Sequence, residues 1–280
     1  MQYSYYPGCS LHEKAAAAEL NDSAVKTARK LDVELVELEE WQCCGAVYPQ
    51  STDGLFPLAA PLRNLARAEE EGDKLITVCS ACYNIHKRVN YRVQEDAELL
   101  ERINSYNRED EYQGGVEVLH LIKVFTELVG LEKVAAAVEA DMDGLKVAPY
   151  YGCMLLRPQE ELSFDDSEAP TIFAELINTT GFEAVEYPHK SECCGAYATV
   201  HLDSPPESAV KSIVNSAATR GAECIAVSCP LCHYNLRKSQ EKIQAESPGF
   251  TFLPVIYFTE LLEYAFGLRE ELAELETRVK

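Results

Sequence analysis

The chain has 280 residues, of which 47% are hydrophobic and 25% are charged, so it can bury the core of one large or two small domains. Its formal net charge of -21 argues against nucleic acid or an anionic membrane surface as a partner. No secretory signal and no apolar run long enough to enter a membrane directly is found, which favours a cytoplasmic protein.

Short apolar segments alternate with helical patterns along the chain. In the first half, aromatic and β-branched residues predict strands at residues 2–6, 33–38 and 74–78. The second half repeats this order, with strands expected at residues 145–150, 182–187, 224–228 and 251–256. The alternation predicts an α/β fold of two tandem duplicated domains, each a small, mostly parallel sheet flanked by helices.

The domains are expected to cover residues 1–140 and 141–280. The interval from the Cys-x-x-Cys motif to a repeated Phe-Thr-Glu-Leu sequence is 43 residues in the first half and 26 in the second. The first domain should therefore carry an extra helical segment, at about residues 92–115. The second should end in an amphipathic helix at residues 268–279, which either packs on the core or binds a partner.

Ten of the eleven cysteines form two sets of five in the same order. In each set a Cys-Cys-Gly sequence precedes a Cys-x-x-Cys, and both motifs recur after 150 residues, Cys43 as Cys193 and Cys79 as Cys229. Cytosolic thiols are kept reduced, so metal ligation or redox catalysis explains the cysteines better than disulfides do. The remaining Cys224 lies on a predicted strand and is expected to be a small buried residue.

The predicted sheets place the cysteines of each half together. Ligands of open parallel sheets bind beyond the carboxyl ends of the strands, where each set of cysteines begins. Structural zinc needs only four ligands, whereas a multi-iron cluster has several metal atoms to ligate. An iron–sulfur cluster in each half is therefore the favoured interpretation, and zinc in at least one half is the alternative.

The spacings Cys-x33-Cys-Cys-Gly-x33-Cys-x-x-Cys and Cys-x39-Cys-Cys-Gly-x33-Cys-x-x-Cys resemble the two CCG domains of HdrB, a family of heterodisulfide reductase subunits. The resemblance covers residues 1–265. It implies two non-cubane [4Fe-4S] clusters. The sequence has no Gly-x-Gly motif for a dinucleotide, so no flavin or nicotinamide is expected in this chain. The ligands implied are Cys9, Cys43, Cys44, Cys79 and Cys82 for one cluster and Cys153, Cys193, Cys194, Cys229 and Cys232 for the other.

The same resemblance implies the reduction or formation of a disulfide, such as CoM-S-S-CoB, between the two clusters. It also implies two partners, an HdrC-like protein with cubane [4Fe-4S] clusters and an HdrA-like protein with flavin. Reducing a disulfide takes two electrons, and iron–sulfur clusters usually pass one each, which suits a pair of clusters. The alternative is a non-catalytic electron-relay component of a larger flavin-dependent oxidoreductase complex.

Four other side chains lie close to cysteines of the second half. His189 and His233 are candidates for a hydrogen bond to cluster sulfur or for donating a proton to a leaving thiolate. Arg157 and Lys190 are candidates for holding an anionic group of the substrate. A purely structural role is the alternative for each of the two histidines.

Overall fold

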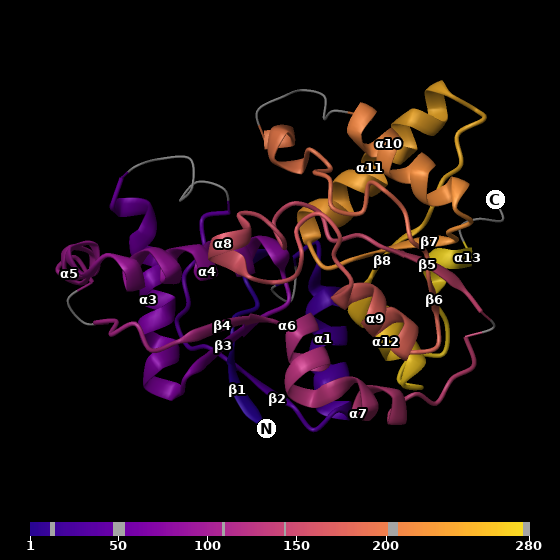
Figure 1. The fold of residues 1–280 in the computed structure, drawn as a ribbon. Coiled ribbons are helices and arrows are strands. Elements are labelled where there is room, and N and C mark those ends of the chain that lie inside the picture. The colour runs from indigo at the N-terminus through magenta and orange to yellow at the C-terminus, as the bar shows by residue number, and fades with distance from the viewer. Residues whose placement is uncertain (12–14, 47–53, 108–109, 143, 201–206, 277–280) are drawn as a thin grey trace.

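The computed structural model describes residues 1–11, 15–46, 54–107, 110–142, 144–200 and 207–276 (Figure 1). These residues form two four-stranded sheets with the strand orders β2-β1-β3-β4 and β6-β5-β7-β8. Every strand pair in them is parallel. The predicted α/β fold with a duplicated, mostly parallel sheet is therefore confirmed.

The strands are short and lie close to the predicted positions. The first sheet contains β1 (Gln2–Tyr5), β2 (Glu34–Glu37), β3 (Lys74–Thr77) and β4 (Glu117–His120). The second contains β5 (Lys146–Pro149), β6 (Glu183–Ala184), β7 (Cys224–Val227) and β8 (Val255–Tyr257). The sequence analysis did not predict β4, because its short apolar run directly follows a long charged stretch.

Helices connect the strands in both halves. The first half contains α1 (Ala18–Lys30), α3 (Phe56–Glu71), α4 (Ser80–Glu95), α5 (Ala97–Asn104), α6 (Leu121–Lys123), the π-helical η2 (Val124–Gly130) and α7 (Leu131–Ala136). The second contains α8 (Gln159–Leu162), α9 (Ile172–Thr179), α10 (Glu207–Thr219), α11 (Pro230–Glu246), α12 (Phe258–Ala265) and α13 (Ala273–Glu276). Two 3-10 turns, η1 (Cys9–Leu11) and η3 (Ala196–Val200), each begin at or shortly after a cysteine. No helix in the described part of the chain is both long and apolar enough to cross a membrane.

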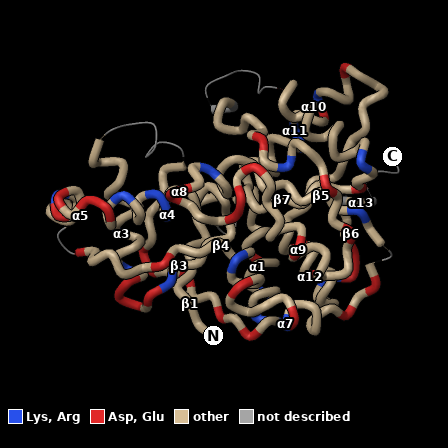
Figure 2. Tube along the Cα trace, in the orientation of Figure 1, with Lys and Arg blue, Asp and Glu red and all other residues tan. Residues whose placement is uncertain are grey.

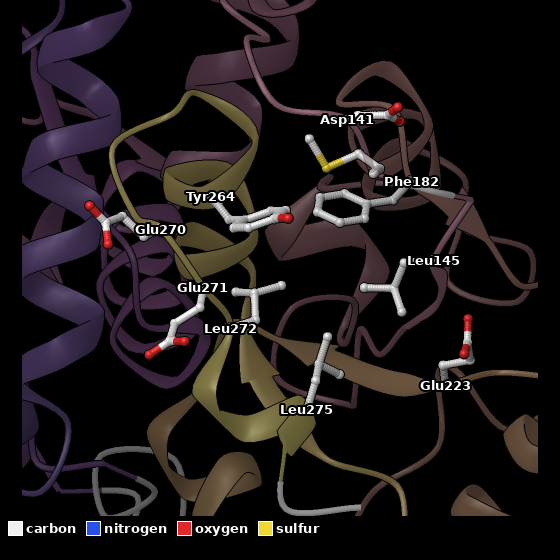
Figure 3. A pocket seen from close by; sticks show the side chains of 10 residues that line it. Asp141, Leu145, Phe182, Glu223, Tyr264, Glu270, Glu271, Leu272 and Leu275 are labelled. Atoms are coloured by element: carbon white, nitrogen blue, oxygen red, sulfur yellow. The ribbon is translucent and has the colours of Figure 1, made fainter.

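Two segments singled out from the sequence have their own structure. Helix α5 occupies the charged stretch at residues 92–115, where the Asp96 side chain accepts a hydrogen bond from the Leu99 N–H at 2.9 Å. At the C-terminus the described helix is only α13, and residues 277–280 lie outside the described residues. Leu272 and Leu275 line a cavity of about 400 Å³ together with Phe182 (Figure 3).

The two halves pack through helices that lie between the sheets (Figure 1). Helix α1 contacts α12, and α6 and α7 contact α9. The Ser23 and Thr259 hydroxyls lie 2.6 Å apart across this contact, and Lys26 pairs with Glu263 at 3.0 Å. The buried Ser23–Thr259 bond and the partly exposed Lys26–Glu263 pair favour one relative orientation of the halves, and with it the relative position of their cysteine sets.

His120, at the end of β4, is buried where the halves meet. Its ring contacts Tyr83, and on the other side Phe164 and Phe258 of the second half. Its Nε2–H donates to the Val78 carbonyl at 2.9 Å, and its Nδ1 accepts from the Ile122 N–H at 3.2 Å. Both ring nitrogens are satisfied only in the neutral form, and burial lowers the pKa of His120 to about 3.

We expect this histidine to make the fold acid-sensitive. The folded pKa lies below that of an exposed histidine, so the unfolded chain binds the proton first as the pH falls. His120 should cost up to about 3 kcal/mol of stability between about pH 6.5 and pH 4. Chemical unfolding at several pH values gives the free energy of unfolding as a function of pH. Between pH 6.5 and pH 4 this free energy should fall less steeply for His120→Gln than for the unmodified chain. Equal slopes would contradict the prediction.

Candidate metal centres

The structure gathers all ten cysteines of the two sets at the carboxyl ends of the parallel strands. Within the first set the Cys9 and Cys43 sulfurs are 3.7 Å apart, and those of Cys44 and Cys82 are 3.6 Å apart. In the second, the Cys194 and Cys232 sulfurs are 3.6 Å apart. All ten are free thiols. The convergence expected from the sheet topology is therefore present in both halves.

The two sets meet at the boundary between the halves. We call this boundary, at Cys79, Ser80, Ser228 and Cys229, the seam. Cys79 and Cys229 lie on facing segments of this boundary, and the neighbouring Cys232 and Cys79 thiols lower the pKa of Cys229. Beside them, the buried Ser80 and Ser228 hydroxyls lie 2.6 Å apart, and the Ser80 N–H donates to the Ser228 carbonyl at 3.3 Å. The ten thiols thus surround one region of the protein.

Two buried tyrosines at equivalent positions hold the Cys-Cys-Gly loops. The Tyr6 hydroxyl donates to the Gln42 carbonyl at 2.9 Å and accepts from the Cys44 N–H at 2.9 Å. The Tyr150 hydroxyl donates to the Glu192 carbonyl at 2.6 Å. The sequence analysis assigned these tyrosines no role, although both belong to a repeated Tyr-x-Gly-Cys sequence that could have revealed them.

The surroundings of these two tyrosines keep their hydroxyl groups protonated, so that each can donate a hydrogen bond. Burial, followed by the nearby Cys82 and Cys44 thiols, raises the pKa of Tyr6 far above its usual value, and burial with Cys194 does the same for the pKa of Tyr150. Neither hydroxyl ionises near neutral pH. Each therefore remains able to fix the carbonyl that immediately precedes a cysteine pair.

Glycines allow the cysteine loops to turn. Gly45 and Gly195 follow the cysteine pairs with φ of 79° and 81°, in the left-handed region that favours glycine. Gly8 also has a positive φ, and a Cβ atom there would lie 2.9 Å from the Cys82 sulfur. Backbone of the Cys9 segment can thus approach this thiol only because residue 8 lacks a side chain.

The residues present fit a polynuclear cluster better than a single metal ion. In the described part of the chain, no group of three or more His, Cys, Asp or Glu side chains has the compact arrangement of a single-ion site. The donors are sulfurs spread around the seam, which suits several metal atoms. Cys79 and Cys229 are the N-caps of the long helices α4 and α11, whose first N–H groups stabilise negative charge on thiolates and sulfides.

The two candidate cations have partners within the protein. Lys190 donates to the Pro170 carbonyl at 2.9 Å and pairs with Glu186 at 2.6 Å. Arg157 donates to the carbonyls of Ser191 at 2.7 Å and Ser167 at 3.1 Å. These bonds tie the loop before Cys193 to the preceding segment, so both cations position the cysteines.

The two candidate histidines differ from each other. His233 stacks on Tyr257 and donates from Nε2 to the Val255 carbonyl at 3.1 Å, and burial lowers its pKa to about 4. The buried Nδ1 of His189 has no hydrogen-bond partner among the described residues. His189 lines an open cavity of about 450 Å³ on the α10 side, and none of the ten cysteines lines that cavity. Cys224, as expected, is buried within β7.

Comparisons with known proteins agree with this arrangement. A family model described as a cysteine-rich domain, CCG, matches residues 3–85 and 147–237. The 8-methylmenaquinol:fumarate reductase membrane anchor subunit of Wolinella succinogenes is 34% identical over 269 residues, covering 95% of this chain and 93% of that protein. The HdrB protein of the ferredoxin/F(420)H(2)-dependent CoB-CoM heterodisulfide reductase of Methanosarcina acetivorans is 32% identical, covering 98% of this chain and 92% of that protein.

A solved structure shares the fold. A hypothetical protein from Helicobacter pylori superposes with a TM-score of 0.71 at 13% sequence identity. The match covers 99% of this chain and 51% of that chain, so this chain spans about half the length of that protein.

The contact of Gly8 with Cys82 leads to a test of the first set of cysteines. Gly8→Ala should displace the Cys82 thiol, and metal bound per chain should fall by about half because the second set is untouched. Metal analysis of the anaerobically purified protein measures this. Gly72→Ala is the matched control, since no atom lies within 4 Å of a Cβ at that position. Equal metal content in the two variants would refute the assignment.

Proposed function

Because the chain belongs to the family of CCG cysteine-rich domain proteins, we propose that it is the iron–sulfur component of a heterodisulfide reductase-like complex. In this proposal it reduces or forms a disulfide, such as CoM-S-S-CoB, between two non-cubane [4Fe-4S] clusters. The relatives named for heterodisulfide reductase support this proposal over nearly the whole chain. The observation that carries it is the pairing of Ser80 with Ser228, whose hydroxyls lie 2.6 Å apart directly beside Cys79 and Cys229 and so hold the two five-cysteine sets next to each other.

Each cluster would be held by one set of five thiols. The first set is Cys9, Cys43, Cys44, Cys79 and Cys82, and the second is Cys153, Cys193, Cys194, Cys229 and Cys232. When bound, the clusters supply one-electron redox chemistry at thiolate-ligated iron. Cleaving a disulfide to two thiols consumes two electrons and two protons, so a pair of centres matches the electron count.

The chain's own residues supply positioning and shielding. Tyr6 and Tyr150 hold the backbone before each cysteine pair, while Lys190 and Arg157 hold the loop that leads to Cys193. Cys79, Cys82, Cys229 and Cys232 are buried, whereas Cys9 and Cys43 are exposed. A substrate would reach the centres from the exposed side of the first set, because the seam side excludes water.

A second candidate function is supported by a specific relative. The Wolinella succinogenes protein is named as the membrane anchor subunit of a fumarate reductase. This chain would then be an electron relay whose clusters pass electrons within a larger flavin-dependent complex and bind no disulfide. Under either function, the proposed partners are an HdrC-like [4Fe-4S] protein and an HdrA-like flavin protein, and the proposed location is the cytoplasm.

Metal analysis tests the cofactor. Anaerobically purified protein should be brown and contain about eight iron and eight sulfide per chain, as two [4Fe-4S] clusters require. Replacing Cys44 or Cys194 by serine should change the EPR signal of one cluster, while Cys224→Ser should change neither, since Cys224 is buried in β7. A colourless protein that contains zinc would contradict the proposal.

Titration with a thiol or disulfide separates the two functions. A catalytic cluster should change its EPR signal when the sulfur of the added compound binds iron, and a relay cluster should not. We expect a change that is lost when Cys43, an exposed member of the first set, is replaced by serine. Spectra that do not respond to CoM-SH, CoB-SH or glutathione would favour the relay function.

A further inference from the structure

The two helices that begin at the Cys-x-x-Cys motifs carry the same basic residues. Helices α4 and α11 are related by the 150-residue repeat that relates Cys79 to Cys229. Under this relation Lys87, Arg88 and Arg92 of α4 correspond to Arg237, Lys238 and Lys242 of α11. Each helix thus presents three cations in the turns that follow its cysteines, in a chain whose net charge is -21.

In the first half, an acidic segment of the second half covers this basic helix. The Asn84 side chain donates to the carbonyls of Met154 at 2.7 Å and Arg157 at 2.9 Å, and the Tyr83 hydroxyl donates to the Leu162 carbonyl at 2.9 Å. Two acidic residues of α8 complete the contact: Glu161 pairs with Arg88 at 2.5 Å, and Glu160 accepts from the Tyr91 hydroxyl at 3.2 Å.

We call residues 153–164 the acidic strap. Figure 2 shows its acidic residues beside basic residues of α4. The strap lies in the longer interval of the second half, where 39 residues separate Cys153 from Cys193. The corresponding interval of the first half, from Cys9 to Cys43, has only 33 residues. The first half therefore has six fewer residues from which to build an equivalent cover for α11.

The exposures of equivalent residues follow this difference. Ala81 and Asn84, under the strap, are 4% and 0% exposed. Their counterparts on α11, Leu231 and Tyr234, are 36% and 57% exposed. Leu231 lies between Cys229 and Cys232 in the sequence, so this exposed surface begins at the turn of α11 that carries the Cys-x-x-Cys motif of the second set. We define the α11 face as Leu231, Tyr234, Arg237, Lys238 and Lys242.

The charge of the α11 face is not cancelled locally. Arg237 and Lys238 share a single carboxylate, Glu241, at 3.7 and 2.8 Å. Lys238 stands at the position equivalent to Arg88, the cation that the strap pairs with Glu161, and an exposed leucine and tyrosine replace Ala81 and Asn84 beside it. The first half therefore shows which kind of surface fits this helix: an acidic helical turn that packs on the two residues beside the cysteines.

We propose that the α11 face is the docking surface of the protein that exchanges electrons with the second cluster, and that this partner binds through an acidic helical turn resembling the strap. The inference rests on the proposed function, since it assumes a cluster at Cys229 and Cys232. Docking there would bring the donor to the first turn of the helix that carries Cys229 and Cys232. Opposite charges would also steer the encounter.

Charge reversal in the intact complex tests the docking surface. The tagged chain is isolated anaerobically with its iron–sulfur or flavin partner, and the partner's rate of reduction of the chain's clusters is followed in the visible spectrum. Arg237→Glu/Lys238→Glu should lower the association rate about tenfold and reduce its dependence on salt. The matched control is Arg102→Glu on α5, an exposed position on a helix of the other half, which should behave like the unmodified chain.

Carbodiimide cross-linking of the same complex identifies the occupant. Lys238 or Lys242 should be joined to Asp or Glu residues of the partner, and mass spectrometry locates the bond. Cross-links from these lysines to a second copy of this chain, or an equal effect of Arg102→Glu, would overturn the proposal. Tyr234→Ala, which keeps every charge, should also weaken binding if the apolar contact resembles that of the strap.

Direct reduction by dithionite separates this proposal from the function on which it rests. The double variant should give the same cluster EPR spectrum as the unmodified chain when dithionite replaces the partner. Unchanged reduction by the partner as well would overturn the docking proposal alone. Absence of reducible clusters in the unmodified chain would overturn both.

Discussion

The arrangement of this protein depends on two helix N-termini that meet. Helices α4 and α11 each begin immediately after an N-cap cysteine, Cys79 and Cys229, and the serines beside these cysteines, Ser80 and Ser228, are joined through hydroxyls 2.6 Å apart. The positive ends of two helix dipoles repel each other unless negative charge lies near both. Thiolates and bridging sulfides supply that charge, and the helices in turn stabilise it. An anionic metal cluster at each helix is therefore consistent with the seam as the chain builds it.

Contacts outside the cysteine motifs also set the orientation of the two halves. Packing of α1 on α12 and of α6 and α7 on α9 sets the two sheets relative to each other. Ser23 with Thr259 and His120 with its aromatic neighbours make that packing specific. Because these bonds are buried and directional, a small change in them would alter the distance between the two sets of thiols.

The duplication has diverged in a way that assigns different surroundings to the two centres. Both halves keep a tyrosine that holds the cysteine pair, and both keep the basic turns of the Cys-x-x-Cys helix. Only the second half contains the acidic strap, and it covers the helix of the other half. The strap consequently covers the helix of the first set, whose Cys9 and Cys43 are exposed, whereas the helix of the second set exposes Leu231 and Tyr234. Two such openings suit a protein that receives electrons on one side and uses or passes them on the other.

The amino-acid sequence alone was sufficient to predict those features of the fold and of the site that depend on residues close together in the chain. The repeat of the cysteine motifs, the α/β alternation and the gathering of each set at the strand ends follow from local patterns and from the geometry of parallel sheets. Strand β4 was missed because its short apolar run has no distinctive local pattern. Only the tertiary structure decided three features: the pairing of Ser80 with Ser228 beside Cys79 and Cys229, the bonds made by Arg157 and Lys190, and the exposure of Leu231 and Tyr234. Each of these features depends on which distant segment packs against a residue. The sequence around that residue does not specify the segment.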